Sequence, residues 1–190
     1  MIISPSQADT LIIALWAAVI LFSFVLGTSR TTKIMLTVPA AAFVANSFGN
    51  FFERIFLSSP SFVQGLKLVN LTGDNDTLIL FKILTFAIVA VLLTTKGAFE
   101  VSLIKPQKAS MSTGINSLFG FLTGGVIVTV VVVFLSGLAF SPLSPTTSTF
   151  TQLYNESPLV KIMFDYQDIW FSAPFVVLII WSFFASGFEE

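Results

Sequence analysis

Cysteine and histidine are both absent from this chain of 190 residues. Disulfides, thiolate or imidazole metal ligands, Cys nucleophiles and Ser-His-Asp triads are therefore excluded. Charge is also scarce, since Lys and Arg together number 9 and Asp and Glu together number 10. Asp165 and Asp168 lie about one helical turn apart, but without a base or metal ligand beside them they indicate a solvated helix face rather than paired catalytic carboxylates. We expect a protein that is not an enzyme, with no catalytic residues, no metal site and no cofactor.

Apolar residues are what the chain has in abundance. They make up 55% of it against 10% charged residues, and the mean hydropathy is +0.92. An ordinary soluble domain carries about 25% charged residues, so this composition cannot coat a soluble globule. No basic patch with interleaved aromatic residues is present, which argues against nucleic-acid binding. We expect one integral membrane domain over residues 1–190, with the lipid bilayer as its main partner.

The longest apolar block reads NSLFGFLTGGVIVTVVVVFLSGLAF, from Asn116 to Phe140, and contains no charged residue. Its valine run resembles a buried strand. Soluble strands rarely exceed about 10 residues, however, whereas a helix needs roughly 20 apolar residues to cross about 30 Å of hydrocarbon. In lipid each backbone N–H and C=O must also be paired within its own segment. The length of the block therefore predicts a membrane-spanning helix.

The same pattern along the chain predicts an all-α, polytopic helical membrane protein. Pro39 should kink the second helix. The last apolar run contains Pro174, and whether it spans, re-enters or lies at the interface stays open. Ser157 and Pro158 are a good N-cap and first residue for a short helix, and the Ser/Thr/Pro-rich stretch before them is typical of a linker. The expected helices cover about residues 10–28, 34–52, 78–95, 115–140 and 169–188, the interfacial segments about 53–72 and 157–168, and the linker about 141–152.

Few polar side chains interrupt the apolar runs. Asn46, Ser47 and Asn50 lie near one helical face, which should look inward. These residues could line a pore, but interhelical hydrogen bonding is the interpretation that we prefer. Lys82 is the only charged residue clearly inside an apolar run, and we expect its stem to snorkel to the nearby helix end.

Small residues gather on the predicted fourth helix. Gly120 and Gly124 form a G-x-x-x-G pattern, and Gly114, Ser117 and Gly125 extend the small-residue surface in both directions. Missing side chains allow the backbone of a neighbouring helix to approach closely, which is how helices associate in lipid. The pattern predicts a helix contact, and it leaves open whether the contact lies within one chain or between copies.

The distribution of Lys and Arg near the helix ends predicts the orientation in the membrane. The two short loops on one side carry Arg30, Lys33, Lys96, Lys105 and Lys108, and the segments on the other side carry Arg54, Lys67 and Lys161. We therefore expect the two short loops to be cytoplasmic and the N-terminus to lie outside. The N-x-Ser/Thr acceptor patterns, which matter only in a eukaryotic secretory host, fall on the predicted outer side at Asn70, Asn75 and Asn155.

Three stretches resemble the colicin V production protein (CvpA-like) family of bacterial inner-membrane proteins. They are GTSRTTK, STGINSLFGFLTGGVIVTVVVVFL and ESPLVKIM. The second is the most telling, because the family typically reads Asn-x-x-x-Gly with further small residues where Asn116, Gly120 and Gly124 stand. The resemblance implies a four-helix protein of the bacterial cytoplasmic membrane, connected with toxin export and envelope homeostasis and without recognised catalytic residues.

Two functional hypotheses follow. The leading one is a scaffold or accessory subunit in secretion or envelope maintenance, which works by helix association with copies of itself or with other membrane proteins. It is motivated by the uncharged small-residue face and by the absence of catalytic or ion-coupling residues. The alternative is a small oligomeric channel or pore, in which Asn46, Ser47 and Asn50 line a water-filled path.

Overall fold

The computed structural model describes residues 5–57, 59, 64, 74–97, 109–136 and 148–185. The regular structure of these residues is helical and includes no strand, which confirms the all-α fold class. A helix lies in each of the predicted apolar runs, over nearly all of the part that the structure describes. The elements are α1 (Pro5–Leu26), α2 (Thr28–Phe52), the π-helical turn η1 (Glu53–Leu57), α4 (Asp74–Lys96), α5 (Ala109–Leu135), α6 (Ser148–Glu156), α7 (Pro158–Asp165) and α8 (Gln167–Ala185).

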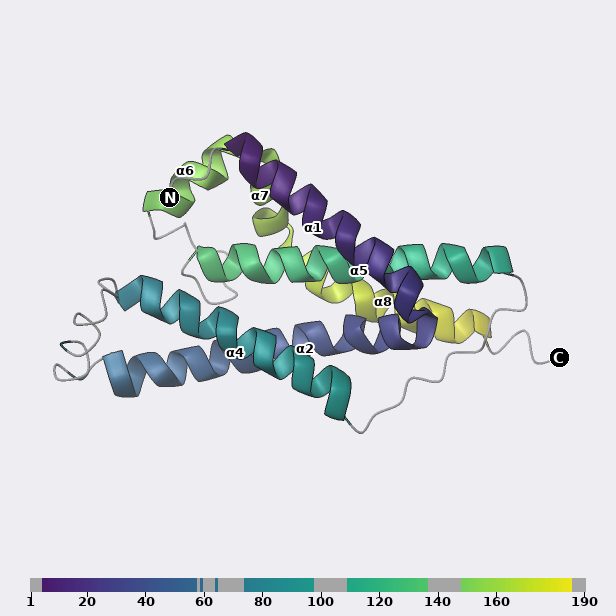
Figure 1. Cartoon of the computed structure of the whole chain (residues 1–190), viewed down its shortest axis with the longest axis horizontal. Coiled ribbons are helices and arrows are strands. Elements are labelled where there is room, and N and C mark those ends of the chain that lie inside the picture. Colours follow the sequence, from purple (N-terminus) through teal and green to yellow (C-terminus); the bar gives the residue numbers. More distant parts are fainter. Residues whose placement is uncertain are drawn as a thin grey trace.

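Helix α5 lies at the centre of the bundle (Figure 1). It packs against α1 and α2, and α8 lies alongside it. In the apolar stretch of α5 that could span a membrane, 72% is buried inside the protein. The corresponding share is 22% for α4 and 6% for α1. The helix without charged residues is therefore the core of the bundle, while α1 and α4 turn most of their apolar surface outward.

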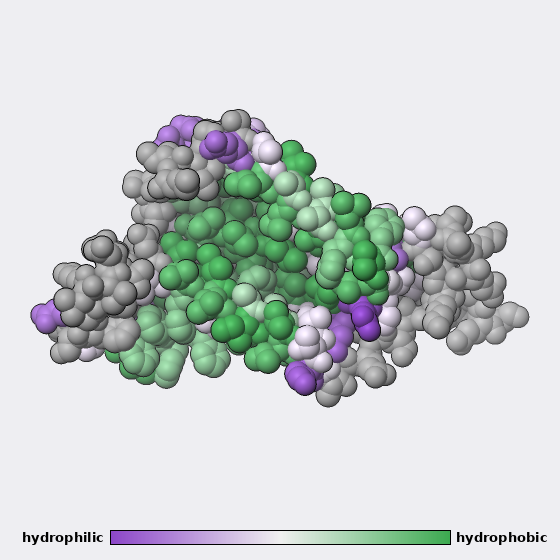
Figure 2. All heavy atoms as spheres, in the orientation of Figure 1, coloured by the Kyte–Doolittle hydropathy of each residue, from purple (hydrophilic) through white to green (hydrophobic). Residues whose placement is uncertain are grey.

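Four helices are long and apolar enough to cross a membrane, and they cover Gln7–Leu26, Thr28–Phe56, Thr77–Lys96 and Thr113–Leu135. Helices α7 and α8 together form a further candidate span, bent by 64° at the break between them. An apolar band runs across the middle of the face seen in Figure 2, with hydrophilic residues toward its two ends. These features indicate a multi-pass membrane protein.

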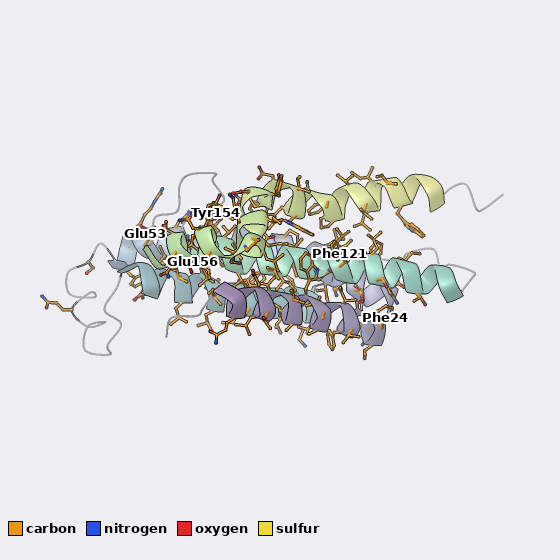
Figure 3. The ribbon with its side chains drawn as sticks, turned by 90° about the horizontal axis from the view of Figure 1, so that it is seen from above. Phe24, Glu53, Phe121, Tyr154 and Glu156 are labelled. Atoms are coloured by element: carbon orange, nitrogen blue, oxygen red, sulfur yellow. The ribbon has the colours of Figure 1, made fainter. Side chains whose placement is uncertain are left out.

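The two ends of the bundle differ in charge. At one of them, which we call the basic end, α1 and α4 finish and α2 and α5 begin. At the other, the capped end, α6 and α7 pack against α1, and α7 also packs against α5. Figure 3 shows Glu53, Tyr154 and Glu156 at the capped end and Phe24 toward the basic end, with Phe121 between them. The charged residues described at the basic end are Arg30, Lys33 and Lys96.

Helices α1 and α2 are joined by Gly27 alone. Gly27 has a φ of 76°, a conformation that glycine adopts at little cost. Its N–H donates to Ser23 O, and its carbonyl accepts from Thr31 N, both at 3.0 Å. The expectation of a basic loop before a helix starting near residue 34 was therefore wrong, and Arg30 and Lys33 belong to the first turns of α2. One residue with positive φ reverses the chain, so no longer loop is needed.

Helix α2 continues past Pro39, where we expected a kink, without a break. It runs on into η1, so that residues Thr28–Phe56 form one apolar helical stretch. Pro39 is buried, and α2 packs against both α4 and α5. Packing on several sides holds the helix together at a position where the missing N–H removes one of its own hydrogen bonds.

The capped end contains one confirmed prediction and one correction. Ser157 is the N-cap of α7, because its Oγ accepts from Val160 N at 3.1 Å, and Pro158 is the first helical residue, as expected. The predicted linker is wrong over residues 148–152, which belong to α6. Phe150 packs on Phe164 of α7 with ring centroids 5.4 Å apart, so burial of aromatic side chains stabilises a helix where Ser and Thr predicted none.

Several other predictions fall outside the described residues. They concern residues 137–140 of the fourth apolar run, residues 141–147 of the linker, residues 186–188 of the last apolar run, nearly all of the interfacial segment after residue 57, and Lys67, Asn70, Lys105 and Lys108. Asn75 lies in the first turn of α4, and Asn155 lies exposed in α6.

Candidate functional site

Two glycines of α5 face α1. A Cβ added at Gly120 would lie 2.9 Å from Ser23 Cβ and 3.2 Å from Ile20 Cα, so α1 approaches α5 more closely than any larger residue would permit. A Cβ at Gly124 would collide with the indole ring of Trp16. The G-x-x-x-G pattern is thus used for a contact within the chain, one of the two roles that the sequence left open.

The remaining small residues of α5 do not share one partner. A Cβ at Gly125 would collide with the ring of Trp170 on α8, so this glycine serves the contact on another side of α5. Gly114 is exposed and has no atom within 4 Å of the position of a Cβ, and Ser117 is half-buried. The five-residue surface predicted from the sequence is therefore divided between α1, α8 and the outside.

The rings of two tryptophans and a phenylalanine pack together where α1, α5 and α8 meet. Trp16 Nε1 donates to Phe121 O at 2.8 Å, and the two rings stack with centroids 4.8 Å apart. Trp16 also meets Trp170 edge to face, with centroids 5.2 Å apart. The glycines provide the room for these rings, and the rings fill it, which fixes the register of the three helices.

A polar cluster is buried between α1, α2 and α5 near the basic end, and we call Ser23, Thr31 and Asn116 the hydroxyl-amide cluster. Ser23 Oγ donates to Ile20 O at 2.6 Å and lies 3.1 Å from Asn116 O. Thr31 Oγ1 donates to Gly27 O at 2.9 Å and lies 3.2 Å from Ser23 O. Ser23 and Thr31 are each 2% exposed and Asn116 is 8% exposed. Three helices thus bring neutral oxygen atoms together inside an apolar bundle.

One atom of this cluster stands out, because the side-chain oxygen Oδ1 of Asn116 is buried and has no hydrogen-bond partner within the protein. Most buried polar atoms in folded proteins are paired, and an unpaired acceptor in a low-dielectric environment is unfavourable. Such an atom is a good position to look for a ligand. We therefore take the hydroxyl-amide cluster as the candidate site.

The sequence reasoning selected Asn116 only as part of the resemblance, and it missed Ser23 and Thr31. Ser23 stands alone in an apolar run, and Thr31 lies in a stretch that we read as a basic loop. The position of Asn116 relative to Gly120 is at most a partial signal. Asn116 lies one turn before Gly120, and a serine on the neighbouring helix fits into the space that this glycine leaves. No pairing rule connects residues so far apart in sequence, so only the fold reveals the cluster.

A second buried polar contact lies between α2 and α4. Lys82 Nζ donates to Asn46 Oδ1 at 3.1 Å, and a Cβ at Gly49 would collide with the Lys82 stem. Lys82 is 4% exposed, so the expectation that its stem snorkels to the helix end was wrong. The space left by Gly49 allows the stem to lie across α2 instead, where Asn46 provides an acceptor.

The polar face predicted on α2 is only partly directed inward. Asn46 is half-buried and accepts the hydrogen bond from Lys82. Asn50 is half-buried, and Ser47 is exposed on the outside of the bundle. The interhelical hydrogen bond that we preferred is present at Asn46. Within one chain the three residues do not face a common space.

The basic end is held together by a lysine. Lys33 Nζ on α2 donates to Gly97 O, directly after α4, at 2.9 Å, while Arg30 and Lys96 are exposed. A lysine ammonium on the free carbonyls at a helix C-terminus is a favourable arrangement. The described topology residues therefore lie at one end of the bundle, although α2 and α4 are far apart in sequence.

The capped end has its own polar contacts. Ser157 Oγ is hydrogen-bonded to Asp9 Oδ1, which ties the start of α7 to α1. Tyr154 OH donates to Asp165 Oδ1 at 2.7 Å, and this hydrogen bond, with some burial and the negative charge of Asp165, raises the pKa of Tyr154. Asp168, at the start of α8, is exposed. In the described part of the chain no group of three or more acidic residues is placed to hold a metal ion.

Comparison of the chain with models of known families, with curated proteins and with solved structures finds no match. The chemistry of the candidate site is thus read from its own atoms. The hydroxyl groups of the hydroxyl-amide cluster can donate hydrogen bonds, and the amide oxygen of Asn116 can accept one. They form no base-activated nucleophile, because no titratable side chain accompanies them in the cluster.

Proposed function

We propose that this protein is a non-enzymatic, multi-pass scaffold or accessory subunit of a bacterial cytoplasmic membrane, acting in secretion or envelope maintenance as the CvpA-like resemblance implies. The proposal rests on one observation: some helices of the bundle make their contacts within the chain, and others turn apolar surface outward. Gly120, Gly124 and Gly125 of α5 are all used in contacts within the chain, so we take α5 as the internal support of the bundle. Any partner must then be met by the helices that surround it.

The outward apolar surface is large enough for such contacts. On α1, side chains spaced at helical intervals form one exposed stripe, made of Leu11, Leu15, Phe22 and Val25, with exposed fractions from 41% to 81%. Helix α4 exposes a comparable set that includes Leu80, Leu84, Ile88 and Val91. In a membrane these surfaces face either lipid or the helices of another protein, and a scaffold works through the second kind of contact.

The orientation that we propose places the basic end in the cytoplasm. Lys and Arg near the ends of membrane helices favour the cytoplasmic side, and the charged residues described at that end are all basic. The chain lacks cysteine, so single cysteines can report on the two sides. An impermeant maleimide should label Asn155→Cys at the capped end in intact cells and Ser29→Cys at the basic end only after permeabilisation. The reverse labelling would overturn the orientation.

Site-directed photo-crosslinking in the native membrane tests the scaffold role. A photoreactive residue at Phe22 of α1 or at Ile88 of α4, which are 57% and 51% exposed, should give an adduct of defined mass with another polypeptide. The same residue at Phe119, which is 1% exposed, is the matched buried control and should give none. Lipid adducts alone at both exposed positions would contradict the proposal.

Adducts that contain only further copies of this chain would favour the alternative, an oligomeric channel. In that case conductance across a planar bilayer decides between a structural oligomer and a pore. Purified, folded oligomer that leaves the bilayer silent would exclude the pore, and conductance that is lost on replacing Asn50 with Leu would support it.

A further inference from the structure

We propose that α6 and α7 together form a hinged lid over the half of α5 at the capped end, and that the lid opens when α7 and α8 straighten into one continuous helix (Figure 1). The inference is independent of the scaffold role, since it uses only contacts within this chain. It starts from the break between α7 and α8. The two helices are bent by 64° on either side of Tyr166, and together they are long and apolar enough to form a single span.

The local sequence does not explain this break. Sharp bends in helices almost always occur at Pro, at Gly or Ser pairs, at π-bulges, or where a side chain or water inserts. No Pro or Gly occurs between Leu159 and Ala173, and α8 continues through Pro174 without a break. Tyr166 has a φ of −106° and a ψ of 26°, so one residue outside the helical region separates the two helices.

The burial pattern is that of one helix. Buried or partly buried side chains recur every three or four residues from α7 into α8, with no change of phase at the break. They are Val160, Met163, Gln167, Trp170, Pro174 and Val177. Exposed apolar side chains follow at matching intervals, and they are Ile162, Tyr166, Ile169, Val176 and Ile180. We infer that the same residues can form a continuous helix and that contacts of the lid impose the bend.

The two helices of the lid are held to each other. Tyr154 OH of α6 donates to Asp165 Oδ1 of α7 at 2.7 Å. The rings of Phe150 and Tyr154 pack on Phe164 of α7, with centroids 5.4 and 5.7 Å apart. Lys161 Nζ lies 5.8 Å from the centroid of the Tyr154 ring. We therefore expect α6 and α7 to move as one body about Tyr166.

Two kinds of contact keep the lid closed on the bundle. Ser157 Oγ, at the start of α7, is hydrogen-bonded to Asp9 Oδ1 of α1. Met163 packs in one cluster with Val128 of α5, and Thr129 Oγ1 donates to Met163 Sδ at 3.5 Å. In a membrane the apolar part of this packing gains little from the hydrophobic effect, because lipid tails are as apolar as the side chains. The polar contact at Asp9 therefore has a large share in keeping the lid closed.

The closed form also carries a cost at the hinge. Gln167, the first residue of α8, is 4% exposed, and its Oε1 is buried with no hydrogen-bond partner in the described part of the chain. An unpaired buried acceptor is unfavourable. The N–H groups at the start of a helix also lack partners within it, whereas a continuous helix would pair those of Gln167 and Asp168 with the carbonyls of Met163 and Phe164. Straightening exchanges these costs for the contacts under the lid, and two conformations of similar free energy are the result.

The test measures the hinge directly. The chain lacks cysteine, so spin labels on two introduced cysteines report one distance by double electron–electron resonance on the full chain in lipid nanodiscs. Val25→Cys on α1 is combined with Lys161→Cys on the lid. The matched control combines Val25→Cys with Ile169→Cys on the other side of the hinge, and all three positions are exposed. Straightening by 64° moves Lys161, five residues from Tyr166, by about 8 Å. We expect two populated distances for the lid pair and one for the control pair.

Variants should shift the balance in opposite directions. Asp9→Ala removes the contact with Ser157 and should raise the ratio of open to closed lid at least about fivefold, whereas Asp9→Asn keeps an acceptor oxygen and should change it little. Gln167→Met removes the unpaired oxygen at similar size and should lower the ratio. A single lid-pair distance that Asp9→Ala leaves unchanged would overturn the proposal. Equal changes in the lid pair and the control pair would overturn it too, because they would show that the whole bundle moves rather than the hinge.

Discussion

Lys82 of α4 donates a hydrogen bond of 3.1 Å to Asn46 Oδ1 of α2, with its stem lying over Gly49. The contact lies inside two membrane-spanning helices, where an unpaired ammonium is costly and a paired one holds the helices in register. We therefore expect the contact to contribute to the free energy of unfolding only when both residues are present.

A double-mutant cycle measures that dependence. Asn46→Leu leaves the buried ammonium without its acceptor and should lower the free energy of unfolding by about 1–3 kcal/mol. Combining it with Lys82→Met removes the charge and should recover most of the loss, because a well-packed apolar pair can replace a buried polar one. The free energies come from unfolding in mixed detergent and denaturing micelles. Strictly additive effects of the two substitutions would show that the contact contributes nothing of its own.

Two glycine substitutions on α5 should have opposite signs. Gly124→Ala places a methyl group against the Trp16 ring, which Phe121 holds in place, and should destabilise the protein by about 1–3 kcal/mol. Gly114→Ala, in the same helix but with open space around it, should stabilise it by about 0.5–1 kcal/mol. Thermal unfolding followed by circular dichroism compares the two. Equal shifts would mean that the α1 contact does not require a glycine.

The cap of α7 should tolerate fewer residues than an ordinary N-cap. Ser157→Ala removes the acceptor for Val160 N and the contact with Asp9, and should cost about 0.5–2 kcal/mol. Asp is usually as good a cap as Ser, but Ser157→Asp would place a second carboxylate beside Asp9 and should destabilise the helix too. Hydrogen exchange of the α7 amides reports the effect. Protection equal to that of the original protein in Ser157→Asp would argue against the Asp9 contact.

The raised pKa of Tyr154 predicts a loss of stability in alkali. The hydrogen bond to Asp165 favours the neutral phenol, so the folded protein holds this proton at pH values where the unfolded chain has lost it. The resulting stabilisation is present below the ordinary tyrosine pKa of about 10 and is lost as the pH rises through the higher folded value.

Ultraviolet titration of tyrosinate in a Tyr166→Phe background isolates Tyr154, because the chain has only 2 tyrosines. The midpoint should lie above the ordinary value and should fall on Asp165→Asn, which removes the negative charge and weakens the hydrogen bond. The effect on stability should be small, since the hydrogen bond between Tyr154 and Asp165 is exposed and therefore screened by solvent. A midpoint that does not respond to Asp165→Asn would rule out the contact as the cause.

Local patterns predicted some features well and misjudged others for identifiable reasons. Ser157 and Pro158 predicted the start of α7 correctly, because a cap depends on a few neighbouring residues. The direction of the Lys82 side chain was predicted wrongly. Its partner, Asn46, lies on another helix, and no local pattern reveals such a partner. The stretch after Gly27 was read as a loop, because polar residues are as common in loops as in the first turns of a helix, and only the positive φ of one glycine distinguishes the cases.

The sequence by itself determined that this protein is helical and multi-pass, because the length of an apolar run and the need to pair every backbone group in lipid depend on each segment alone. The tertiary structure decided which helix is central, which neighbours the glycines of α5 meet, and that Ser23, Thr31 and Asn116 lie together. These features depend on how side chains from distant segments fit against one another. In an all-apolar setting many pairings satisfy the hydropathy equally well, and the close fit of small residues, rings and hydrogen bonds selects one of them.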